Sequence, residues 1–137
     1  YELDPTSIYP LIHMAGIFRD RGHGQDALRC VDQAISRSRS RDLDIMKMSI
    51  LADMGRHTDA VSYGLSVLEK GPDTEVSIMV ATFQMDVLND PRSAVITLDR
   101  ALVSDPDSDA INTLRAEAVV RSEGSLEDIV SSPGFDV

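Results

Sequence analysis

Apolar side chains recur along this chain at the spacing of a single helix face. Three stretches place apolar or small residues at positions i, i+1, i+4, i+7 and i+8: Ala27-Leu28-x2-Val31-x2-Ala34-Ile35, Ala60-Val61-x2-Gly64-x2-Val67-Leu68 and Ala94-Val95-x2-Leu98-x2-Ala101-Leu102. This period indicates amphipathic helices, and the period-two alternation typical of strands is absent. The sequence therefore predicts an all-α fold.

The three stretches repeat with a nearly fixed stride. Their first alanines lie 33 and 34 residues apart. The turns keep step with them, because Pro5, Arg39, Pro72 and Pro106 are separated by 34, 33 and 34 residues. A proline that follows a helix prevents its continuation, so we expect a repeating unit to end at each of these turns.

A second break divides each unit into two helices. It falls at Gly22-His23-Gly24, at Gly55-Arg56-His57 and at Asn89-Asp90-Pro91. Glycine, asparagine and proline mark turns, and proline also suits the first turn of a new helix. The first helix of each unit is accordingly predicted over Ser7–Arg21, Arg41–Met54, Thr74–Leu88 and Ser108–Ser122.

The predicted domain organisation is a single domain over residues 1–137. Its repeats fall at about 8–40, 41–74 and 75–108, followed by a degenerate fourth repeat or cap at 109–132. After Gly124 the pattern stops, and Ser125-Leu126-Glu127-Asp128 resembles a capping box that begins a short separate helix, ended by Pro133-Gly134. Asp4-Pro5 stands where a preceding repeat would end, so we expect further repeats upstream.

A two-helix unit of this length resembles the tetratricopeptide repeat, whose loose pattern is W-x2-L-G-x2-Y, then A-x3-F, then P. The first unit offers Leu11-x2-Met14-Ala15-x2-Phe18 and Ala27-x3-Val31, and the third offers Ile78-x2-Ala81-Thr82-x2-Met85, Ala94-x3-Leu98 and Pro106. The resemblance covers residues 5–123 and rests on length and phase, so a related helical repeat is the alternative. It implies a right-handed superhelix of antiparallel helix pairs, a TPR-like α-solenoid of about three and a half repeats.

In the tetratricopeptide family, the first helices line a concave surface that binds peptides or partner proteins. The resemblance implies a partner-binding groove at Tyr9, Ile12, Gly16, Ile45, Ser49, Val76, Met79 and Phe83, with Asp42, Ala110, Thr113 and Glu117 at equivalent positions. Helix Thr74–Leu88 is apolar nearly all round, which is typical of a buried or bound helix. The hypothesis is a groove for an extended or helical peptide; the alternative is that these residues pack on neighbouring helices.

The formal net charge of −10 narrows the class of partner. Nucleic-acid binding and adsorption to anionic membranes both need a basic surface, so we expect neither. No stretch reaches the ~20 apolar residues that span a bilayer, so membrane insertion is not expected. The acidic surface either keeps the chain in solution or attracts a basic partner.

No catalytic residue, cofactor site or metal site is predicted. The histidines His13, His23 and His57 lack the spacing of a helical metal pair. Cys30 is the single cysteine, which excludes an internal disulfide and favours a reducing, cytoplasmic compartment. The aspartate-rich turn at 105–109 lacks the glycine and glutamate that a calcium loop requires.

The function predicted from these observations is a protein–protein interaction scaffold, and not an enzyme. The expected partner is a protein or a peptide bound through the concave face. Two alternatives stay open. The chain is an element of self-assembly that forms homo-oligomers, or it is a repeat region appended to an enzyme whose catalytic domain lies elsewhere in the parent chain.

Overall fold

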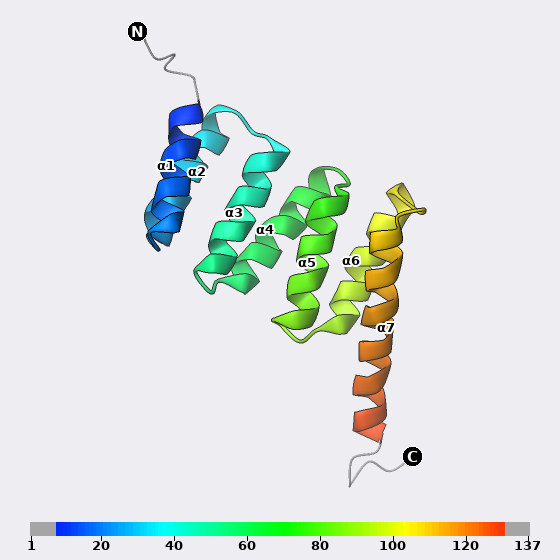
Figure 1. The fold of residues 1–137 in the computed structure, drawn as a ribbon. Helices are drawn as coiled ribbons and strands as arrows, with labels where there is room; N and C mark the ends of the chain where they lie inside the picture. The colour runs from blue at the N-terminus through cyan, green and yellow to red at the C-terminus, as the bar shows by residue number, and fades with distance from the viewer. Residues whose placement is uncertain (1–7, 131–137) are drawn as a thin grey trace. The chain divides into compact units, whose positions relative to one another are not determined.

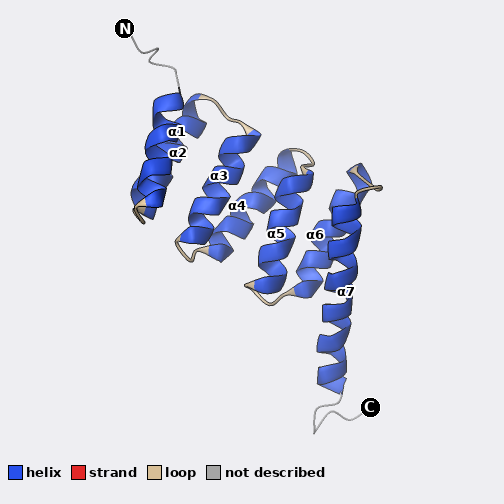
Figure 2. Ribbon diagram, viewed as in Figure 1, coloured by secondary structure: helices blue, strands red, loops and turns tan. Residues whose placement is uncertain are grey.

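The computed structural model describes residues 8–130, with side chains described for residues 8–123. Over this range helices joined by short loops make up the chain, and there is no strand (Figure 1; Figure 2). This confirms the predicted all-α class. The helices are α1 (Tyr9–Asp20), α2 (Gly24–Arg37), α3 (Arg41–Asp53), α4 (His57–Lys70), α5 (Thr74–Asp86), α6 (Pro91–Ser104) and α7 (Asp109–Val130).

The end of the last helix differs from the prediction. Helix α7 runs without interruption through Gly124 and Ser125 to Val130, so the separate short helix expected to begin at Ser125 is wrong. A glycine inside a helix costs only about 1 kcal/mol relative to alanine, which is too little to end a helix whose other residues favour it. The predicted turns at Asp4-Pro5 and Pro133-Gly134 lie outside the described residues.

A residue in the left-handed region of backbone space closes the first helix of every hairpin. Gly22, Gly55 and Asn89 have φ angles of 76°, 77° and 53°. They lie 33 and 34 residues apart, which is the stride of the apolar pattern. Glycine and asparagine are the residues that adopt this conformation at least strain, so the turn residues recognised in the sequence are required by the backbone.

The hydrogen bonds at these helix ends repeat as well. After α1, the His23 amide donates to the Phe18 carbonyl at 2.8 Å, and the Gly22 amide donates to the Arg19 carbonyl at 3.1 Å. The equivalent two bonds, of 2.8 and 2.9 Å, close α3 around Gly55. This is the Schellman arrangement, in which the left-handed residue satisfies the last carbonyls of the helix.

Three of the first helices also begin in the same way. The side chains of Ser40, Asp73 and Ser108 each accept a hydrogen bond from the backbone amide three residues later, at 3.3, 3.1 and 3.3 Å. Such N-caps contribute typically about 1 kcal/mol each to helix stability. Helices α3 and α5 are thus marked by local chemistry at both ends, whereas α1 has no side-chain N-cap.

The structure divides into two units between Gly64 and Leu65. The first unit contains α1, α2, α3 and the first half of α4, and the second contains the rest of α4 with α5, α6 and α7. In the first unit, Asp32 on α2 pairs with Lys47 on α3 at 2.8 Å. In the second unit, Asp99 on α6 pairs with Arg115 on α7. Asp99 follows Asp32 by 67 positions, and Arg115 follows Lys47 by 68.

A second pair of contacts recurs with its charges exchanged. Arg19 on α1 bonds to Asp53 on α3 in the first unit. Asp86 on α5 bonds to Arg121 on α7 at 2.7 Å in the second, again 67 and 68 positions later. Both units therefore join their two first helices at equivalent positions. The repeat is present in the contacts as well as in the amino-acid sequence.

The alanines that reveal the stride lie in the core. Ala27, Ala60 and Ala94 are each fully buried, with 0% exposure. A methyl side chain lets neighbouring helices approach closely, which explains why a small residue recurs here. In the second unit the core comprises Ala81, Met85, Ala94, Leu98, Ala101, Ile111 and Ala118.

Candidate functional site

The residues predicted to line the binding groove divide between the two units. In the first unit, Tyr9 is 79% exposed. Ile12 and Gly16 on α1, and Ile45 and Ser49 on α3, are half-buried. Each of these residues therefore reaches the surface at least in part.

In the second unit, one of the predicted groove residues is buried. Val76 on α5 is 0% exposed, so its assignment to the groove is wrong. Val80, one helical turn further on, is also 0% exposed, which shows that this face of α5 points into the protein. Met79 and Phe83 are half-buried. A groove that includes all the remaining predicted residues stays a prediction.

A shallow groove of about 450 Å³ lies between α5 and α7. Its lining residues are Ile78 and Thr82 from α5 and Asp109, Ala110, Thr113, Leu114 and Glu117 from α7. Both helices are first helices of their repeats. Ala110, Thr113 and Glu117 occupy the positions that the family resemblance assigned to the binding surface, and all three are exposed.

The groove is apolar in its middle and acidic on α7. Ile78 and Leu114 are partly buried and pack against the core of the second unit. Asp109 and Glu117 supply carboxylates on α7. Such a surface suits an apolar side chain, and its charge favours a basic residue beside that side chain.

The Glu117 carboxylate is itself held in place. It accepts a hydrogen bond from Nη2 of Arg121 at 2.6 Å, while Nη1 of Arg121 donates to Asp86 at 2.7 Å. The hydrogen bond to Asp86, followed by the charges of Glu117 and Asp86, raises the pKa of Arg121. These contacts orient Glu117 at one border of the groove.

Sequence reasoning missed Ile78, Thr82 and Leu114. Ile78 was placed in the packing stripe, and its side chain does pack against the core. Because that side chain is only partly buried, it also lines the groove. The available signal was the spacing of Ile78 and Thr82, which are one helical turn apart and therefore share a face.

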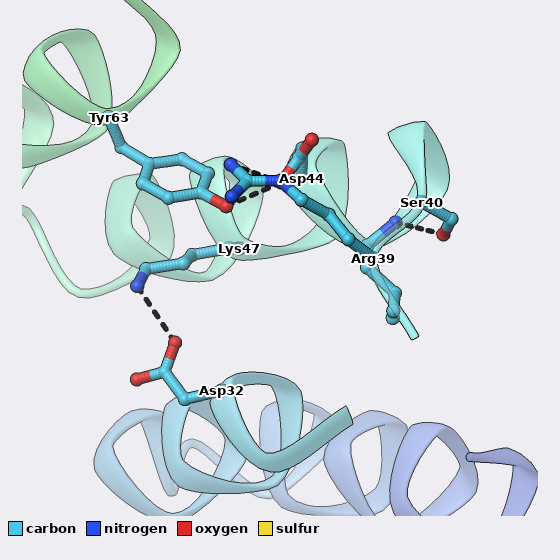
Figure 3. A network of polar contacts seen from close by, with 7 residues as sticks. Asp32, Arg39, Ser40, Asp44, Lys47 and Tyr63 are labelled. Carbon is cyan, nitrogen blue, oxygen red and sulfur yellow. Dashed lines mark hydrogen bonds and ion pairs between the residues drawn. The ribbon is translucent and has the colours of Figure 1, made fainter. Parts of the chain in front are cut away.

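A second cluster of polar side chains surrounds the buried Asp44 in the first unit (Figure 3). Tyr63 on α4 donates its hydroxyl to Oδ1 of Asp44 on α3, and Asp44 is only 5% exposed. Nη2 of Arg39 lies 3.7 Å from the same oxygen. Burial, and then the hydrogen bond to Asp44, raises the pKa of the Tyr63 phenol, which keeps the phenol protonated as a donor.

Lys47 extends this cluster to α2. Its Nζ lies 4.6 Å from the centre of the Tyr63 ring and bonds to Asp32 at 2.8 Å. An ammonium over an aromatic ring is attracted by the negative face of the ring. We call Asp32, Arg39, Asp44, Lys47 and Tyr63 the Tyr63 network. It connects α2, α3 and α4 within the first unit.

Among the described residues, no group of three or more His, Cys, Asp and Glu side chains could hold a metal ion. Cys30 is free and buried. Over the same part of the chain, no helix is both long and apolar enough to cross a membrane.

Comparison with protein-family models, with curated proteins and with solved structures gives no match for this chain. The likeness to tetratricopeptide repeats therefore depends on the stride, the turns and the repeated contacts described above.

Proposed function

We propose that this chain is a protein–protein interaction scaffold built of tetratricopeptide-like hairpins. It binds a segment of a partner protein through the surface of its first helices. The observation that carries the proposal is the groove between α5 and α7. It lies on two first helices, and it combines partly buried apolar side chains with exposed residues.

The dimensions and charge of the groove suggest the kind of segment. A volume of about 450 Å³ in a shallow groove suits one or two side chains of an extended or helical peptide. Asp109 and Glu117, together with the net charge of −10, favour a peptide that carries Lys or Arg next to its apolar anchor.

The same proposal includes a right-handed superhelix of stacked hairpins. Its support is the constancy of the unit. The left-handed turn residues and the N-caps recur once per repeat, at spacings of 33 to 35 residues, and the ion pairs recur after two repeats. A hairpin that cannot bury its apolar faces alone is stabilised by stacking on its neighbours.

Selection from a random peptide library tests this function, with two matched variants of α7. Ala110 lines the groove, whereas Ala116 is exposed on the same helix and does not line it. Ala110→Arg should weaken the selected peptides at least tenfold, because the long cation occupies the groove and repels basic residues. Ala116→Arg should leave their affinity unchanged. Equal effects of both substitutions would place binding elsewhere.

Self-assembly is a second candidate, favoured by one observation on α6. Ile96 and Val103 are 57% and 84% exposed. They lie seven residues apart, so they share a face of the helix. Light scattering over a range of protein concentrations tests this candidate. A mass that rises with concentration, and that falls in Ile96→Lys, supports it, whereas a constant monomer mass rejects it.

A further inference from the structure

A hollow of about 370 Å³ lies in the second unit among α4, α5 and α6. Its lining residues are Leu65, Leu68, Glu69, Pro72, Ser77, Thr97, Arg100, Ala101 and Ser104. None of them lines the α5–α7 groove, so the hollow is a separate feature. Its volume falls within the range of about 300–1,000 Å³ that small-molecule sites occupy.

The hollow occupies the repeat positions that the Tyr63 network fills in the first unit. Four lining residues of the hollow lie one repeat after residues of the Tyr63 network. Leu65, Pro72 and Ser77 follow Asp32, Arg39 and Asp44 by 33 positions each, and Thr97 follows Tyr63 by 34. The buried carboxylate of Asp44 is thus replaced by a serine. The tyrosine ring is replaced by the much smaller threonine. A hollow thus adjoins the two residues that correspond to Asp44 and Tyr63.

Ser77 leaves a polar atom facing this space. Its side chain is 3% exposed, and no hydrogen bond among the described residues involves its hydroxyl. Every fully buried side-chain oxygen or nitrogen in that part of the chain has a hydrogen-bond partner. Because the Ser77 hydroxyl has none, it is not fully buried. It therefore reaches the hollow that Ser77 lines. A hydroxyl that gives up its contact with water is stabilised by a new hydrogen-bond partner.

Thr97, by contrast, has its hydrogen bonds satisfied within the protein. Its hydroxyl contacts Oε1 of Gln84 at 2.9 Å and the carbonyl of Ser93 at 3.1 Å. Among the buried hydroxyls that line the hollow, the one without a hydrogen bond in the described part of the chain is therefore that of Ser77. Leu65 and Leu68 supply apolar walls beside it.

We propose that this hollow binds a phenol ring, whose hydroxyl donates to Ser77. The first unit shows the arrangement, because the Tyr63 hydroxyl donates to Asp44 at the equivalent position. Arg100 lines the hollow, is exposed and forms no ion pair among the described residues. Its guanidinium is available to lie over the bound ring, much as Lys47 lies over Tyr63.

Amide chemical shifts of the full chain, measured while 4-methylphenol or toluene is added, test the proposal. The two probes are alike in shape and differ by the hydroxyl. We expect 4-methylphenol to bind weakly but saturably, with the shifts concentrated in α4, α5 and α6. Toluene should bind several-fold more weakly. Equal affinity of the two probes, or shifts spread over the whole chain without saturation, would overturn the proposal.

Ser77→Ala separates the hydrogen bond from the space. It removes an oxygen that has no partner among the described residues, so the fold should be retained. The affinity for 4-methylphenol should fall roughly two- to tenfold, the range of a single hydrogen bond, while toluene binding should not weaken. Ser62→Ala, at an exposed serine of α4, is the control and should change neither. Unchanged 4-methylphenol affinity in Ser77→Ala contradicts the proposed contact.

Filling the hollow gives an independent test. Thr97→Tyr places a ring at the position of Tyr63 and should abolish binding of 4-methylphenol. If Thr97→Tyr does not fold, Ala101→Leu enlarges another lining residue and should have the same effect. Retained binding in a folded variant refutes the site.

The source of the phenol is distinguished by a third probe, N-acetyltyrosinamide. If it binds as tightly as 4-methylphenol, the hollow accepts a tyrosine side chain of a partner. If only 4-methylphenol binds, the hollow takes a small phenolic molecule. Failure of both probes rejects the inference and leaves the α5–α7 groove untouched, because the two sites share no residue.

Discussion

The Tyr63 network offers the sharpest test of how the first unit is held together. Tyr63→Phe removes one oxygen and keeps the ring, so the packing of the side chain and the Lys47 contact over the ring are retained. The change leaves Asp44, which is 5% exposed, without its phenol donor. The remaining cation of the network, Arg39, has its Nη2 3.7 Å from the carboxylate, too far for a good hydrogen bond.

The expected loss of stability follows from the bond being a hydrogen bond to a carboxylate. A hydrogen bond to a charged group contributes about 1.5–3 kcal/mol to stability. Tyr63 is only half-buried, so water can reach part of the site and partly replace the phenol. We therefore expect Tyr63→Phe to lower the free energy of unfolding by about 1.5–2 kcal/mol, near the lower end of that range.

Urea unfolding of a double-mutant cycle measures this contribution. In the Asp44→Ala background the acceptor is absent, so Tyr63→Phe should cost less than about 0.5 kcal/mol, the usual effect of a change outside any special contact. The reasoning is refuted if Tyr63→Phe costs the same with and without Asp44.

Three further predictions concern the turns, the core and the phenol. Gly55→Ala should destabilise the chain by about 1–2 kcal/mol, because alanine is strained at its φ of 77°. Gly71→Ala, where an added Cβ meets nothing within 4 Å, should be neutral or slightly stabilising. In thermal unfolding, Leu98→Ala should cost about 2–5 kcal/mol, since Leu98 is 0% exposed, whereas Val103→Ala at an 84% exposed site should cost less than about 0.5 kcal/mol. The folded state raises the pKa of Tyr63 above its ordinary value of 10.0. The stabilisation of the folded state by the protonated Tyr63 phenol should therefore be complete below pH 10.0 and be lost as the pH rises through the pKa of Tyr63 in the folded state. A late component in the ultraviolet absorbance of phenolate, absent in Tyr63→Phe, would show this.

The parts of the fold that were predictable are those fixed by local chemistry. Turns at Gly22 and Gly55 could be read from the sequence because their positive φ angles favour glycine. The stride of the alanines was visible because each one meets the same packing requirement. Gly124 misled the prediction, since the cost of glycine within a helix is too small to end it.

The candidate site was harder to predict because it depends on how each helix is rotated. Val76 and Ile78 are two residues apart on an apolar helix, and the sequence alone does not say which of them faces the core. The pairing of Asp44 with Tyr63 joins residues 19 positions apart and leaves no local pattern. The hollow beside Ser77 becomes recognisable only after the Tyr63 network has been seen at the equivalent positions of the first unit.

The central claim is that the first helices form the binding surface, and mapping one selected peptide by amide chemical shifts tests it most directly. We predict that the largest changes fall on the residues that line the α5–α7 groove, with Ile78, Thr113 and Leu114 among them. Changes of that size confined to the exposed face of α6, or to the hollow beside Ser77, would contradict the claim.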